Sequence, residues 1–172
     1  MEKEIFTTIV LDMSCTDEEW EFVSDTDIIY RIQGIDDLEQ KDRDGRTLLI
    51  NAACYGRADV VDYLLRRGAD VCAKDNSGFT VLHAGVMSND IKTVKSVLEA
   101  GADANAKNQF GNTPVMVANL LTDLKIFRVL IDNGADPHQK NNYGISAFDM
   151  FSCSADILTI FRGTQGDGSP VS

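Results

Sequence analysis

The stretch DNSGFTVLHAGV, which begins at Asp75, decides the fold of this chain because it returns at a fixed interval. Related stretches begin at Asp42 (DRDGRTLLINAA), Asn108 (NQFGNTPVMVAN) and Asn141 (NNYGISAFDMFS). A second phrase recurs in step, beginning at Gly68 (GADVCAKD), Gly101 (GADANAKN) and Gly134 (GADPHQKN). Both phrases return every 33 residues in one register. Such self-similarity is the signature of a repeat architecture.

Each repeat unit contains the signals of a tight turn followed by two helices. The Gly three residues after the initial Asp or Asn supplies a backbone conformation that turns need. The hydroxyl two residues later can cap the first helix, and it belongs to Thr47, Thr80, Thr113 or Ser146. Small residues then let neighbouring helices approach closely, at Ala52, Gly85 and Ala118. Gly56 and Asn89 follow the first helix, since both tolerate a left-handed backbone. Apolar residues spaced by three and four form one stripe on the second helix.

This pattern resembles the ankyrin repeat, a 33-residue unit of a β-turn and two antiparallel helices. The family's TPLH phrase is best kept at residues 80–83 (TVLH) and 113–116 (TPVM), whereas residues 47–50 (TLLI) lack both Pro and His. The resemblance implies an all-α, ankyrin-like repeat solenoid of helix-turn-helix units joined by β-hairpin loops. Because single units cannot bury their apolar faces alone, we expect degenerate capping units at both ends.

The chain divides into three predicted parts. Residues 1–41 form an acidic helical N-terminal cap with a degenerate repeat, and residues 42–162 form an array of three full repeats and a C-terminal capping repeat. Residues 163–172 are small and polar, which predicts a disordered tail. Phe151 occupies the position of the small helix residues, so nothing is expected to stack beyond it. We expect Phe148, Phe151 and Ile160 to seal the core there.

The net charge of −11 lies almost wholly at one end of the sequence. Residues 1–41 hold 12 acidic and 3 basic side chains, whereas residues 42–172 hold 15 and 13. This balance argues against binding to a nucleic-acid backbone or an anionic membrane surface. The acidic cap, namely Asp17, Glu18, Glu19 and Glu21, has two interpretations. It keeps a terminal unit soluble and favours a helix start, or it forms an electrostatic site for a basic partner.

The sequence predicts a cytoplasmic protein. The first residues carry charges of both signs and lack the apolar run of a secretory signal, and no apolar stretch approaches the roughly 18 residues of a membrane helix. The four cysteines lie far apart, form no CxxC pair and are interpreted as reduced thiols: Cys15, Cys54, Cys72 and Cys153. Secretion without an N-terminal signal stays an alternative.

No catalytic, metal or cofactor site is predicted. The resemblance assigns His83 to the TPLH position, where the ring links neighbouring turns by hydrogen bonds, and His138 is expected to be exposed in a hairpin. No His/Cys cluster has zinc spacing, and the only G-x-G lies in the tail (Gly166–Gly168). The carboxylates of the second phrase, which recur at the repeat period, are expected to bond hairpin amides: Asp70, Asp103 and Asp136.

The resemblance places the partner-binding surface in a concave groove lined by hairpin tips and first helices. The residues expected there are Arg43, Asp44, Arg46, Tyr55, Phe79, Met87, Ser88, Phe110, Asn112, Leu120, Leu121, Tyr143 and Ile145. Four of them are aromatic (Tyr55, Phe79, Phe110 and Tyr143) and are expected to form a row of binding anchors, with Tyr55 and Phe79 favoured as contacts. Alternatively, aromatic side chains at the hairpin tips stiffen the stack. Leu120 and Leu121 either meet a partner or cover a helix end. The regular lysines Lys74, Lys107 and Lys140 are expected to be a solvated row.

Three hypotheses for function follow. The first is a stoichiometric inhibitor or immunity-type protein that blocks a basic toxin or enzyme, acting as a monomer. The second is a regulatory or scaffolding adaptor, for which the aromatic row matters and the acidic cap does not. The third, which is disfavoured, is an enzyme that uses Cys54 or Cys153 with a histidine.

Overall fold

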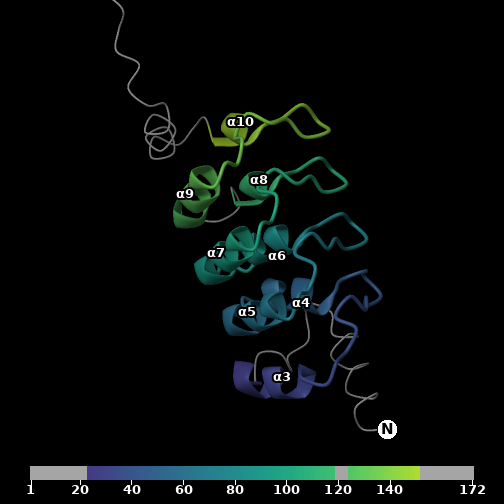
Figure 1. The fold of residues 1–172 in the computed structure, drawn as a ribbon. Coiled ribbons are helices and arrows are strands. Elements are labelled where there is room, and N and C mark those ends of the chain that lie inside the picture. Colours follow the sequence, from purple (N-terminus) through teal and green to yellow (C-terminus); the bar gives the residue numbers. More distant parts are fainter. Residues whose placement is uncertain (1–22, 119–123, 152–172) are drawn as a thin grey trace, which may run out of the picture.

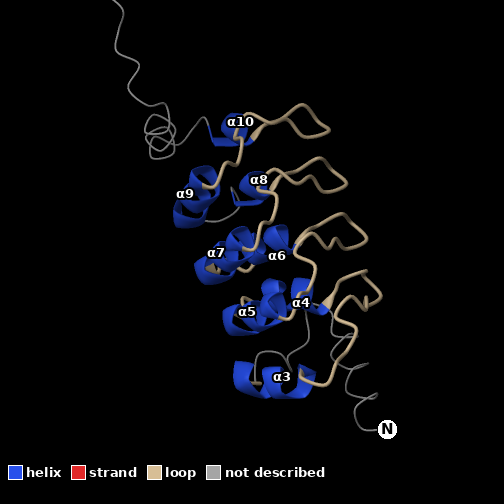
Figure 2. Ribbon diagram, in the orientation of Figure 1, coloured by secondary structure: helices blue, strands red, loops and turns tan. Residues whose placement is uncertain are grey.

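The computed structural model describes residues 23–118 and 124–151, whose helices stack in two layers (Figure 1). The layer beside the hairpins consists of α4 (Leu48–Cys54), α6 (Val81–Met87), α8 (Pro114–Ala118) and α10 (Ala147–Phe151). The outer layer consists of α3 (Asp25–Ile32), α5 (Ala58–Arg66), α7 (Ile91–Glu99) and α9 (Leu124–Asp132). Within these residues the β structure is limited to isolated bridges, so the all-α expectation is confirmed (Figure 2).

All four hairpin turns are built on one side-chain device. The Oδ1 atom of the initial Asp or Asn accepts the amides two and four residues later, as in Asp75, which binds the amides of Ser77 and Phe79 at 2.8 Å each. The same pair of bonds forms at Asp42, Asn108 and Asn141. The turn glycines adopt φ values of 75 to 77°, which is the conformation predicted from the sequence.

The first helices start as predicted in three of the four units. Thr47 and Thr80 accept amide hydrogen bonds from the third helical residue, and Ser146 accepts one from Asp149. The predicted cap at Thr113 is wrong, because its buried hydroxyl has no hydrogen-bond partner. The amide of Met116 instead bonds the Thr113 carbonyl at 3.0 Å, so the first turn of α8 is wound more tightly.

The predicted left-handed helix ends are also confirmed. Asn89 has a φ of 57° after α6, and Gly56 has a φ of 63° after α4. The glycines of the second phrase end the outer helices with φ values of 87 to 94°, namely Gly68, Gly101 and Gly134. Asn89 is the one residue other than glycine with positive φ in the described part of the chain, and asparagine tolerates this conformation better than most residues.

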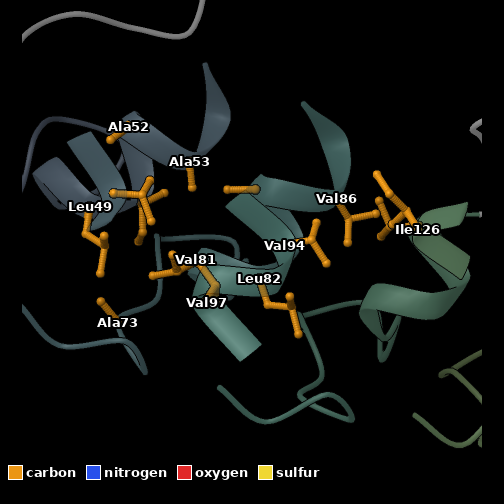
Figure 3. Packing of buried hydrophobic residues seen from close by; sticks show 14 of the residues in the cluster. Leu49, Ala52, Ala53, Ala73, Val81, Leu82, Val86, Val94, Val97 and Ile126 are labelled. Atoms are coloured by element: carbon orange, nitrogen blue, oxygen red, sulfur yellow. The ribbon is translucent and has the colours of Figure 1, made fainter. Parts of the chain in front are cut away.

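The core runs between the two layers, and Figure 3 shows part of it from close by. It contains side chains from both layers, such as Leu49 and Val81 of the first helices and Val94 and Ile126 of the outer helices. Burying each such side chain contributes about 1.5–3 kcal/mol. At Gly85 an added Cβ would lie 3.0 Å from the Thr93 methyl group, so the small residue does allow close approach.

The ends of the stack are described in part. At the N-terminal end α3 confirms the helix of the degenerate repeat, and Ile28 and Ile32 join the core. At the C-terminal end Phe148 is half-buried and its ring lies 4.8 Å from that of His138. The side chains of Phe151 and Ile160, the acidic cap and the tail lie outside the described residues. The division at residues 41 and 162 stays a prediction.

Candidate protein-binding surface

The hairpins are joined to one another by a ladder of main-chain hydrogen bonds. The amide of Asn76 donates to the carbonyl of Asp44 at 2.9 Å, and the amide of Gln109 donates to the carbonyl of Ser77 at 3.0 Å. The third rung runs from the amide of Asn142 to the carbonyl of Phe110 at 3.1 Å. The hairpin tips therefore form one continuous edge rather than four independent loops.

Side chains reinforce this ladder. The Asn142 carboxamide donates to the Gln109 carbonyl at 2.9 Å, and the Asn76 carboxamide makes the equivalent bond to the Arg43 carbonyl two units earlier. The ammonium group of Lys107 donates to the Lys140 carbonyl at 2.8 Å. All three regular lysines are exposed, as expected. Lys107 in addition binds the next hairpin through this hydrogen bond. The composition and spacing of the sequence did not indicate that bond.

His83 links two units from a fully buried position. Its Nδ1 atom accepts from the Thr80 amide at 3.2 Å, so the ring proton of the neutral imidazole lies on Nε2. Nε2 donates to the carbonyl of Asn112 in the next hairpin at 3.0 Å. Burial, as the main cause, lowers the pKa of His83 from 6.5 to about 4. The linking role that the sequence assigned to His83 is confirmed.

The predicted aromatic row falls into two pairs that differ in exposure. Tyr55 and Phe79 are half-buried against the core, and the Phe79 ring lies 5.2 Å from the imidazole of His83. Phe110 is 43% exposed and Tyr143 is 71% exposed. These two share one place in their hairpins, two residues after the initial Asn, whereas Tyr55 and Phe79 occupy other places. Tyr55 and Phe79, which the sequence analysis favoured as partner contacts, are thus less accessible than Phe110 and Tyr143.

The remaining predicted contacts differ in how firmly they are held. Met87, the last residue of α6, is 57% exposed, and Ile145 is 42% exposed. Ser88 donates its hydroxyl to the Gly85 carbonyl at 2.9 Å. The Asn112 side chain accepts from the Asn141 carboxamide at 2.8 Å, which ties it to the next hairpin.

The first hairpin presents charged side chains. Arg46 lies 3.7 Å from the carboxylate of Asp44 and is more buried than it, and Arg43 is exposed beside them. Leu120 and Leu121 lie outside the described residues, as do all four residues of the acidic cap.

The second-phrase carboxylates serve the scaffold. Asp70, Asp103 and Asp136 each accept the amide two residues later at 2.8 Å, as the sequence predicted. Among residues 23–118 and 124–151, no group of three or more His, Cys, Asp or Glu side chains could hold a metal ion. In the same residues, no helix is both long and apolar enough to cross a bilayer.

One exposed residue was not singled out from the sequence. Tyr30 on α3 is 75% exposed, more than any other large hydrophobic side chain of the described residues. The sequence does indicate this exposure, because Tyr30 lies off the apolar stripe formed by Ile28 and Ile32.

Comparison with known proteins agrees with this geometry. A family model described as ankyrin repeats (3 copies) matches residues 22–108 and 82–162. A comparison with curated proteins found no match.

Proposed function

The chain belongs to the ankyrin-repeat family of protein–protein interaction modules, and we propose that its partner is a basic toxin or enzyme that it blocks by one-to-one binding. The partner docks on the hairpin tips and the first helices. It is held and occluded there and is not chemically transformed.

The observation that carries this proposal is where the exposed apolar side chains lie. Of the described residues, five large hydrophobic side chains are exposed, and four belong to the predicted groove: Met87, Phe110, Tyr143 and Ile145. Exposed aromatic and methionine side chains are typical anchors of protein interfaces. The fifth, Tyr30, belongs to α3, which is a helix of the outer layer (Figure 1).

The hairpin ladder supports the same use. Loops that are already hydrogen-bonded to one another lose little conformational entropy when a partner binds. The anchors Phe110 and Tyr143 lie on adjacent hairpins that one rung joins, since the Phe110 carbonyl accepts the amide of Asn142. A partner therefore meets a preformed surface with fixed spacing between anchors.

The charge of the N-terminal segment supports a basic partner. Residues 1–41 carry a net charge of −9, and a concentrated field of one sign speeds association with an oppositely charged protein. In this proposal the acidic cap guides the encounter and the groove holds the complex. Cys72 is a free, exposed thiol, which supports a reducing compartment such as the cytoplasm.

The test begins with affinity capture of the partner and its identification by mass spectrometry. We then compare the dissociation constant of Phe110→Ala/Tyr143→Ala with that of Tyr30→Ala, which removes a tyrosine outside the groove that is about as exposed as Tyr143. Loss of two anchors is expected to weaken binding by about 30-fold or more, whereas Tyr30→Ala stays within about twofold of wild type. Equal effects of the two variants would refute the groove assignment.

The acidic cap is tested by kinetics. Reversing Asp17, Glu18, Glu19 and Glu21 to Lys is expected to slow association about tenfold at low salt and to flatten its salt dependence. An unchanged association rate removes the electrostatic part of the proposal. If the captured partner is an enzyme or toxin that keeps its activity in the complex, the inhibitor proposal is wrong and the protein is an adaptor.

A further inference from the structure

Three exposed positions recur on the outer helices with charges that follow a pattern. Each outer helix presents them at the same places in the repeat, at intervals of 33 residues along the chain. The first position holds Asp59, Lys92 and Lys125, the second holds Asp62, Lys95 and Arg128, and the third holds Arg66, Glu99 and Asp132. All nine side chains are exposed except that of Asp62, which is half-buried.

Equivalent positions carry opposite charges on one pair of neighbouring helices and like charges on the next pair. From α5 to α7 every position changes sign, so equivalent positions on these neighbouring helices carry opposite charges (Figure 1). From α7 to α9 every position keeps its sign. Packed helices lie about 10 Å apart, close to the screening length at physiological salt. The charges of α5 and α7 therefore support the stack, whereas those of α7 and α9 work against it.

Nearby groups neutralise this repulsion only in part. Arg128 pairs through Nε with the carboxylate of Asp132 on its own helix at 3.1 Å. Asp90 caps α7 and accepts from the amides of Lys92 and Thr93 and from the Thr93 hydroxyl. In the described part of the chain Lys92 and Lys95 take part in no ion pair.

We propose that the outer face of α7 and α9, formed by Lys92, Lys95, Lys125 and Arg128, binds an acidic segment of a second partner protein. Charge complementarity defines this partner, because the fold itself gains nothing from like charges placed side by side. A protein segment is favoured over a nucleic acid or an anionic membrane, since the chain as a whole carries −11 and repels extended anionic surfaces.

The complementary pattern is already present in the molecule. On α5, the neighbour of α7, Asp59, Asp62 and Arg66 provide two carboxylates three residues apart and a cation four residues further on. A partner helix with the same spacing would match the outer face of α7 or α9. This basic face lies on the layer opposite the hairpins (Figure 1). It can therefore be occupied while the groove holds another protein, so the inference goes beyond the proposed function.

The test uses a fluorescein-labelled deca-glutamate peptide and the full chain, with binding measured by fluorescence anisotropy. Wild type is expected to bind at about 50 mM salt and to weaken steeply by about 150 mM. Lys95→Glu is compared with Arg66→Glu, which makes the same charge change at an exposed position on the neighbouring helix. We expect Lys95→Glu to raise Kd about fivefold, and Lys92→Glu/Lys95→Glu about 20-fold, whereas Arg66→Glu stays within about twofold.

Each contrary outcome overturns a stated part of the proposal. If the peptide does not bind wild type up to about 1 mM, or if Arg66→Glu weakens it as much as Lys95→Glu, the basic face is not a binding site. If a single-stranded deoxythymidine oligomer of equal charge binds more tightly than the peptide, the partner class is wrong. If sedimentation shows a dimer that Lys92→Glu/Lys95→Glu dissociates, the occupant is a second copy of this chain. Circular dichroism verifies that the variants are folded.

Discussion

The buried imidazole of His83 predicts a loss of stability in mild acid. Its pKa is lowered from 6.5 to about 4, chiefly by burial, so the folded protein resists protonation that the unfolded chain accepts. The stabilisation from the neutral ring is complete above pH 6.5 and declines as the pH falls toward 4. At about 1.4 kcal/mol for each pKa unit, the whole contribution is about 3 kcal/mol.

The measurement is urea denaturation at intervals between about pH 7 and pH 5. Over this range protonation of unfolded His83 is expected to lower the free energy of unfolding of wild type by about 2 kcal/mol. His83→Gln lacks the titrating ring, so its free energy of unfolding is expected to fall by much less. At pH 7 the variant is the less stable protein, because it loses the hydrogen bond from Nε2 to the Asn112 carbonyl.

A second variant separates titration from general destabilisation. Val94→Ala removes fully buried apolar surface and leaves His83 in place, at a cost of roughly 2 kcal/mol. It is expected to show the same pH dependence as wild type. If wild type and His83→Gln lose stability in parallel between pH 7 and pH 5, the assignment of a buried neutral imidazole is refuted.

Three further predictions concern the scaffold. Gly111→Ala places a Cβ 2.5 Å from the carboxamide oxygen of the next hairpin's asparagine, whereas at Gly134 nothing lies within 4 Å. Urea denaturation is therefore expected to show a loss of about 3 kcal/mol for Gly111→Ala and about 1 kcal/mol for Gly134→Ala. Thr113→Val is expected to be neutral by thermal unfolding because the hydroxyl has no partner, and Thr80→Val is expected to cost about 1 kcal/mol by removing a cap. Arg67→Ala removes two hydrogen bonds to carbonyls at and after the end of α3, so amide exchange in α3 is expected to quicken about tenfold.

The sequence predicted those features that one repeat unit determines by itself. The turn glycines, the left-handed end at Asn89 and the caps at Thr47 and Thr80 depend on local chemistry, so the period and the residue types were sufficient. Thr113 failed for a local reason too, because a tighter first turn directs the amide of Met116 to a carbonyl.

Features that depend on neighbouring units were predicted less well. The exposure of Phe110 and Phe79 depends on what the adjacent hairpin and the His83 ring cover, and no single stretch encodes that. The charge pattern of α7 and α9 becomes visible only when equivalent positions are placed side by side. The fold class could therefore be predicted from the sequence. Which side chains are exposed could be determined only from the structure of the stacked repeats.

The ladder between hairpins has a consequence for how this protein can change. Its three acceptor positions are Asp44, Ser77 and Phe110, which are an acid, a small alcohol and an aromatic residue, yet each contributes only its carbonyl oxygen. The main-chain bonds of the ladder thus place no demand on the side chains at these three acceptor positions. Evolution or a protein engineer can exchange those side chains, and with them the partner, while the same main-chain bonds keep the hairpins in place.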